Sequence, residues 1–179
     1  MASKKTGSRS FEKPYQEAEP TYLDQRTIYD LGAQAAKELG YKASGNLEKL
    51  IREIGGHIEI GDQFGSSVSG YMSVESPDNF KIVLSAITTQ SRDRFTLAHE
   101  LAHFVLHSNF GEKRVRVSRS SSDRLEWEAN WFAAGFLMPE KSFRKSFASG
   151  MGDSQLAEHF GVSVQAVEIR RKYLGLGAK

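Results

Sequence analysis

Two histidines set four residues apart constrain the fold of this chain more than any other feature. They belong to the run His99-Glu100-Leu101-Ala102-His103. Side chains four apart on an α-helix share one face, one turn along the axis, so both imidazoles can reach one zinc ion at about 2.0–2.1 Å. Glu100 is turned by about 100° from His99 and therefore flanks the ion without displacing a ligand. The run predicts a helix that carries two metal ligands and a catalytic base.

A five-residue pattern of this kind also arises by chance. A zinc site needs a third ligand as well, which must come from elsewhere in the chain. An extended pattern with a Gly and a later His on the same segment fails here, because Leu106 and Asn109 occupy those positions. A carboxylate on a later helix is the other source. Glu126 and Glu128 lie at opposite edges of the apolar stripe of that segment, and periodicity does not choose between them. Glu126 is favoured because Asn130 follows one turn later on the same side and can hold a ligand in place.

His107 lies one further turn along from His103, on the same side. Such a side chain can help to bind an oxyanion, but a histidine that is solvated, or that only supports a ligand from behind, is the more common arrangement. Glu100 is expected to take a proton from water and pass it to the departing amine of a cleaved peptide. The expected strand over residues 70–74 can accept an extended substrate at a sheet edge or lie inside the sheet.

The composition limits both the ligands and the location. The 179 residues include no cysteine, so any metal site must use nitrogen and oxygen donors. A net charge of +2 is too small to argue for nucleic-acid binding by itself. No apolar run reaches the length of a membrane span, and none follows the basic N-terminus as in a secretory signal. We therefore expect a cytoplasmic protein.

The order of expected elements indicates an α+β fold: a small, mostly antiparallel sheet packed with helices. Residues 1–20, with Pro14 and Pro20, predict a flexible N-terminal arm. Residues 21–150 are expected to form a zincin-like metallopeptidase domain, and residues 151–179 a pair of short helices packed on it. The expected helices cover residues 21–39, 47–54, about 91–108, 123–138 and two pieces of 153–175 broken at Gly161; the expected strands cover 57–60, 70–74 and 80–85, with a turn at 76–79.

The two C-terminal pieces raise a competing hypothesis, a DNA-binding regulatory protein. Residues 155–167 fit a helix-turn-helix, in which Gly161 permits the turn and Ser163 caps the second helix. The start of that second helix offers only Val164, Gln165 and Glu168, a poor set for contacts with phosphates or bases. Direct nucleic-acid binding is therefore the less favoured hypothesis, and packing on the core or docking of a partner is preferred. The basic loop 113–124 can attract an acidic substrate, but a solvated loop is the preferred interpretation.

Residues 94–103, together with the Glu-x-x-Ala-Asn arrangement from Glu126 and the sequence Leu137-Met138-Pro139, resemble the ImmA/IrrE family of metallo-endopeptidases. The resemblance covers roughly residues 25–175. It implies a cytoplasmic zinc protease with Zn²⁺ on His99, His103 and Glu126. It also implies a protein substrate, a helix-turn-helix repressor or antitoxin encoded nearby, whose cleavage relieves transcriptional repression in a stress response. One departure is Ser85, which stands where we expect an Asn after the central strand.

Overall fold

The apolar periodicity of the N-terminal third folds as two helices with side-chain caps. The computed structural model describes residues 14–61, 71–84, 90–118 and 123–177. Helix α1 (Gln25–Glu38) begins at Asp24, whose carboxylate accepts a hydrogen bond from the Thr27 amide at 3.0 Å. Helix α2 (Leu47–Glu53) is capped in the same way by Asn46. The predicted start of the first helix at Thr21 is wrong, because the amides just before α1 bind a distant carboxylate.

Four strands form one mixed sheet in the order β1-β3-β2-β4. The predicted hairpin is confirmed: β2 (Tyr71–Ser76) and β3 (Asn79–Leu84) pair antiparallel. Strand β1 (Gly56–Ile60) pairs parallel with β3, and β4 (Arg116–Ser118), which the sequence did not predict, pairs antiparallel with β2. Since β3 and β4 flank β2, the alternative of substrate addition along that strand is wrong over residues 71–73. The α+β fold with a mostly antiparallel sheet is confirmed.

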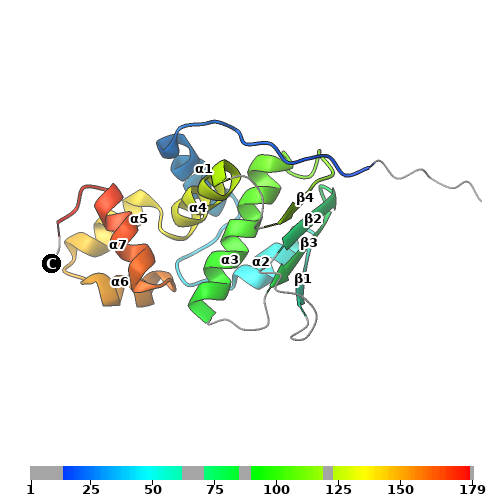
Figure 1. The fold of residues 1–179 in the computed structure, drawn as a ribbon. Helices are drawn as coiled ribbons and strands as arrows, with labels where there is room; N and C mark the ends of the chain where they lie inside the picture. Colours follow the sequence, from blue (N-terminus) through cyan, green and yellow to red (C-terminus); the bar gives the residue numbers. More distant parts are fainter. Residues whose placement is uncertain (1–13, 62–70, 85–89, 119–122, 178–179) are drawn as a thin grey trace, which may run out of the picture.

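The helix predicted over 91–108 has two parts. Helix α3 (Gln90–Ala102) continues into a π-helical turn, η1 (His103–His107), in which the Ser108 amide bonds the His103 carbonyl at 2.9 Å. Figure 1 shows α3 lying between the sheet and the pair formed by α1 and α4 (Asp123–Leu137). The sheet and the α1–α4 pair therefore hold the His99 to His103 segment from opposite sides.

Helices α1 and α4 approach each other at two glycines. A Cβ atom on Gly32 would lie 2.3 Å from the Phe132 carbonyl oxygen, and one on Gly135 would lie 2.2 Å from the Tyr29 carbonyl oxygen. Only glycine permits backbones this close. The crossing fixes the position of α4, which carries both candidate glutamates.

The C-terminal residues form three helices, α5 (Glu140–Ala148), α6 (Asp153–Phe160) and α7 (Val164–Tyr173). The sequence did not predict α5, whereas the break at Gly161 is confirmed by a left-handed φ of 65°. The guanidinium of Arg170 on α7 stacks on the Tyr29 ring of α1 at 4.2 Å, and its Nε donates to the Met138 carbonyl at 3.1 Å. These contacts hold α7 against α1 and the end of α4.

The N-terminal arm was expected to be flexible over residues 1–20, and the structure describes it from residue 14. Gln16 forms a parallel bridge with Val115 beside β4, and the guanidinium groups of Arg114 and Arg116 lie over the Tyr15 ring, 4.3 and 4.4 Å from its centre. The described part of the basic loop therefore contacts this arm. Residues 119–122 and Ser85 lie outside the described residues.

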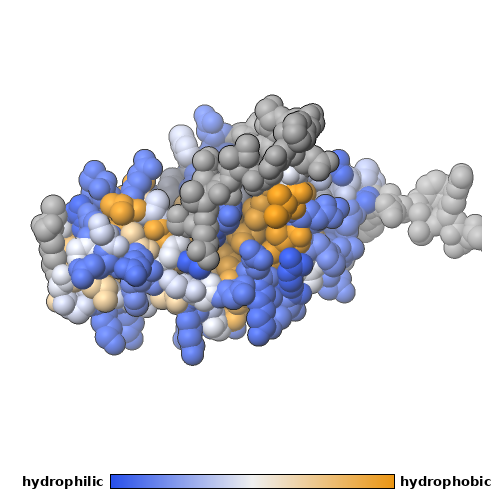
Figure 2. Space-filling model, turned by 90° about the horizontal axis from the view of Figure 1, so that it is seen from below, coloured by the Kyte–Doolittle hydropathy of each residue, from blue (hydrophilic) through white to orange (hydrophobic). Residues whose placement is uncertain are grey.

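The surface view from below is mostly hydrophilic, with a large apolar patch to the right of the centre and a smaller one at the left (Figure 2). Over the described ranges, no helix is both long and apolar enough to span a membrane.

Candidate metal centre

The two histidines of the motif turn the same ring nitrogen toward each other. His99 belongs to the last turn of α3 and His103 begins the π-helical turn, and their Nε2 atoms lie 3.2 Å apart. Both side chains are buried. Two donor atoms bound tetrahedrally at about 2.0–2.1 Å lie roughly 3.3–3.4 Å apart. The pair is therefore spaced as two ligands of one metal ion would be.

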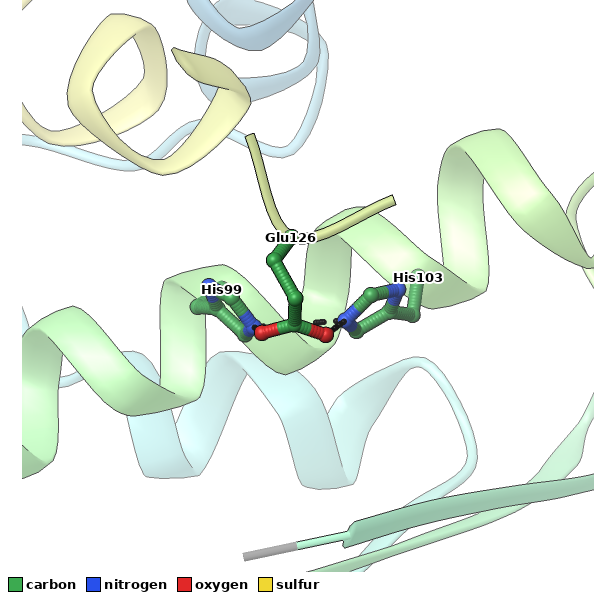
Figure 3. A group of neighbouring side chains, drawn as sticks. All are labelled: His99, His103 and Glu126. Atoms are coloured by element: carbon green, nitrogen blue, oxygen red, sulfur yellow. Dashed lines mark hydrogen bonds and ion pairs between the residues drawn. The ribbon is translucent and has the colours of Figure 1, made fainter. Parts of the chain in front are cut away.

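Glu126, in the first turn of α4, supplies the third donor (Figure 3). Its Oε2 lies 3.3 Å from Nε2 of His99, and its Oε1 lies 3.7 Å from Nε2 of His103. The ligand atoms of the three residues all lie within 4.8 Å of one another. Oε1 of Glu126 is buried and has no hydrogen-bond partner, and a buried carboxylate oxygen normally has one. A divalent cation fits this donor set and would satisfy that oxygen.

Glu128, the alternative that periodicity left open, points elsewhere. Its side chain is fully buried and accepts hydrogen bonds from the amides of Thr21 and Tyr22 and from Nε of Arg124, at 2.8 to 2.9 Å. Its Oε2 also lies 3.1 Å from Nε2 of His107. The structure thus brings Glu126, and not Glu128, to the two histidines of the motif.

Asn130 lies beside the cluster and contacts one of the candidate ligands. Its Oδ1 lies 3.0 Å from Nδ1 of His99, where it can hold that ring in place. An amide oxygen can only accept, so Nδ1 of His99 must carry the proton. Nε2 of His99 would then be the nitrogen that presents a lone pair to a bound metal ion.

Burial and neighbouring charges shift the pKa values of the two histidines of the motif in opposite directions. Burial, reinforced by the adjacent His99 and His107 rings, lowers the pKa of His103 well below its ordinary value. Burial also acts on His99, but the hydrogen bond to Glu126 and the charges of Glu100 and Glu126 outweigh it and raise the pKa of that ring. Burial lowers the pKa of His107 despite its contact with Glu128. Two of the three rings are therefore held neutral at neutral pH.

Glu100 lies next to the cluster in a site shielded from bulk solvent. It is only 2% exposed, and its charge is close enough to influence the His99 ring. The structure thus keeps the expected base near the three donors without making it one of them.

His107 is neither solvated nor open to a substrate. It is 2% exposed, and its Nδ1 lies 2.7 Å from Nδ1 of His103. With Nε2 on Glu128, both ring nitrogens are engaged inside the protein. Sequence reasoning missed Thr21, Tyr22 and Arg124, which hold Glu128; only the spacing of four residues between Arg124 and Glu128 could have signalled one of these contacts.

The fold and the cluster together define a class: an α+β protein with a helical His-Glu-x-x-His site completed by a glutamate from the next helix. Residues 63–172 match the peptidase M78 family model, described as the IrrE N-terminal-like domain, and the chain belongs to this ImmA/IrrE family. It is 28% identical over 85 residues to metallopeptidase ImmA of Bacillus subtilis (strain 168). The aligned stretch covers 46% of this chain and 50% of that protein.

A solved structure shows the same fold at low sequence identity. It is a Mycobacterium tuberculosis transcriptional regulator, 18% identical, with a TM-score of 0.59 over 81% of this chain and 46% of that one. The chain therefore spans about half the length of each of these two proteins.

Proposed function

We propose that this chain is a zinc-dependent endopeptidase whose metal is held by His99, His103 and Glu126. The observation that carries the proposal is the convergence of three donor groups beside Glu100, one of which has a buried carboxylate oxygen without a hydrogen-bond partner. Membership of a peptidase family supports it. Among the common divalent ions, zinc suits a set of two imidazoles and one carboxylate with a position left open.

A zinc ion at these residues would supply Lewis acidity, which polarises a peptide carbonyl and lowers the pKa of water. Glu100 then acts as general base: it accepts a proton from the attacking water and passes it to the amine that leaves. A positioned acid–base group of this kind contributes about 10²–10⁴-fold to the rate. Asn130 keeps the His99 ring in the orientation that the site needs.

The substrate that we infer is a helix-turn-helix repressor or antitoxin encoded nearby, cleaved in the cytoplasm to relieve repression in a stress response. The inference rests on the resemblance of residues 94–103 and of the segment from Glu126 to the family, and on the relative that is called a metallopeptidase.

The alternative, a DNA-binding protein that uses the C-terminal helices, loses support from the side chains of α7. The basic side chains that α7 could offer to DNA include Arg170 and Arg171, but these are 2% and 8% exposed. Arg170 packs against Tyr29, and Arg171 binds the carboxylate of Asp153 at 2.9 Å. Neither guanidinium is available to a phosphate, and a fold shared with a transcriptional regulator at 18% identity does not restore the hypothesis.

The test compares wild type with Glu100→Gln, and uses Glu48→Gln on the exposed face of α2 as matched control. Metal analysis of the purified proteins should find one zinc per chain in all three. Each is then co-expressed with the neighbouring repressor, and fragments are identified by mass spectrometry. We expect one defined cleavage with wild type and the control, and a loss of about 10²–10⁴-fold with Glu100→Gln. Cleavage by Glu100→Gln at the wild-type rate would contradict the mechanism, and an intact repressor in every case would contradict the substrate.

A further inference from the structure

A buried carboxylate stands at the end of a row of three histidines that begins in the metal centre. Glu128 contacts His107, His107 contacts His103, and His103 faces His99 and Glu126. Glu128 is not part of the donor cluster. Glu128 is in turn held by the N-terminal segment: the amides of Thr21 and Tyr22 and the Thr21 hydroxyl all donate to it, at 2.8 to 2.9 Å.

The surroundings of Glu128 fix it as an acceptor. Besides Thr21 and Tyr22, Nε of Arg124 donates to it at 2.8 Å. The Arg124 guanidinium forms an ion pair with this carboxylate, and the donors of Thr21 and Tyr22 surround both of its oxygens, so the ionised form is favoured. An ionised carboxylate has no proton to donate. Its contact with His107 therefore requires a proton on Nε2 of that ring.

The position of the proton on His107 in turn determines the tautomer of His103. With its proton on Nε2, a neutral His107 offers an unprotonated Nδ1 to the Nδ1 of His103 at 2.7 Å. Two facing nitrogens at this distance share one proton, so His103 must carry it on Nδ1. Nε2 of His103 is then left with its lone pair, and it is this atom that points at His99 and Glu126.

The π-helical turn supplies the geometry. In a regular α-helix, residues four apart overshoot a full turn by about 40°, so a third histidine would drift off the line of the first two. A π turn holds more residues, so four residues fall short of a full turn and bring His107 back under His103. The ring centroids of His103 and His107 lie 4.9 Å apart, the same separation as between His99 and His103.

We propose that Glu128 and His107 are positioning residues that fix the tautomer of His103, and that the backbone at Thr21 and Tyr22 is thereby part of the metal centre. The inference rests on the proposed metal site. It assigns a function to an N-terminal segment that lies more than 70 residues before the motif in the sequence. The two histidine ligands are then supported differently: His99 directly by Asn130, and His103 through a relay of two side chains and the chain's own N-terminal backbone.

The first test reads the tautomers directly in the full-length, metal-free protein. Long-range ¹H–¹⁵N correlation spectra distinguish the protonated ring nitrogen of a histidine from the unprotonated one. We expect a proton on Nδ1 of His99 and His103 and on Nε2 of His107. In Glu128→Gln the amide can donate to His107, so the proton on His103 should move in part to Nε2. A wild-type spectrum with His103 protonated on Nε2 would overturn the proposal, whatever the enzyme does.

The second test measures zinc affinity by competition with a chromophoric chelator. Loss of a side chain that supports a metal ligand costs about 10–100-fold in affinity, and we expect this for Glu128→Gln and for His107→Phe, which keeps the buried ring shape. Thr21→Val removes one hydroxyl donor and should have a smaller effect. Asn130→Ala is the matched control: it should weaken zinc binding through His99 and leave the tautomer of His103 unchanged. Circular dichroism checks that each variant is folded.

The outcomes separate this inference from the proposed function. If wild type binds zinc and Glu128→Gln and Thr21→Val bind it within twofold of wild type, with the His103 tautomer unaltered, the positioning role is wrong and the metal site stands. If wild type does not bind zinc, the proposed function fails, and the tautomer spectra still decide whether the relay exists.

Discussion

Replacement of Gly32 by alanine tests whether the close crossing of α1 and α4 is required. A Cβ atom at this position would lie 2.3 Å from the Phe132 carbonyl oxygen and 2.9 Å from the Phe136 amide nitrogen. Both are backbone atoms of α4, so a rotamer change cannot relieve the overlap. Ordinary contacts of a Cβ atom begin at 3.4 Å. The helices would have to separate by about 1 Å, and α4 would carry Glu126 with it.

Two opposing terms set the size of the effect. Alanine in place of glycine inside a helix is worth roughly 0.5–1 kcal/mol in its favour, whereas overpacking a tight contact costs about 1–3 kcal/mol. Since the overlap is with backbone at two points, we take the upper end and expect a net loss of about 2 kcal/mol. For a chain of this length, that lowers Tm by about 4–8 °C.

Thermal and urea unfolding, followed by circular dichroism, measure this loss. Ala33→Gly on the same helix is the control, because it should cost only the propensity term of roughly 0.5–1 kcal/mol. A Gly32→Ala protein as stable as wild type, or more stable, would show that propensity outweighs the contact and that the crossing is not tight.

Three further predictions concern the metal centre and the N-terminal arm. Glu126→Gln should bind zinc more weakly than wild type in a chelator competition, and unchanged affinity would exclude Glu126 as the third ligand. Zinc at 100 times its Kd should stabilise the fold by about 2.7 kcal/mol and raise Tm by roughly 5–10 °C, and a chelator should reverse the rise; an unaltered Tm would speak against a site formed in the folded state. The Tyr15 hydroxyl, followed by Arg114, lowers the pKa of Glu75 below its ordinary value of 4.5. The stabilisation by Glu75 is therefore present above that value and lost as the pH falls through the lower folded pKa, so the Tm difference between wild type and Glu75→Gln should close at acid pH.

Much of the fold follows from local patterns in the sequence. Apolar periodicity and the turn at 76–79 predicted α1 to α4, the three longer strands and the break at Gly161, because each pattern repeats over several residues. Strand β4 was missed because it has only three residues, inside a segment rich in Arg and Ser. Helix α5 was missed although Phe143 and Phe147 stand four residues apart.

The candidate site could also be predicted only in part from the sequence. Spacing alone places His99 and His103 on one helix face, whereas the choice between Glu126 and Glu128 depends on tertiary contacts. Glu128 binds amides 106 and 107 residues away, and no local pattern encodes such a pairing. The same pairing explains why the helix does not begin at Thr21.

The bridge between Gln16 and Val115 has a consequence for the behaviour of the protein in solution. A strand at the border of a sheet presents unpaired amide and carbonyl groups that recruit strands from other molecules. Next to β4, the Gln16 amide donates a hydrogen bond to the Arg114 carbonyl at 2.7 Å. The Tyr15 ring packs against the guanidinium groups of Arg114 and Arg116. Chains trimmed past Gln16 would uncover this border, and self-association at high concentration would then be their first visible defect.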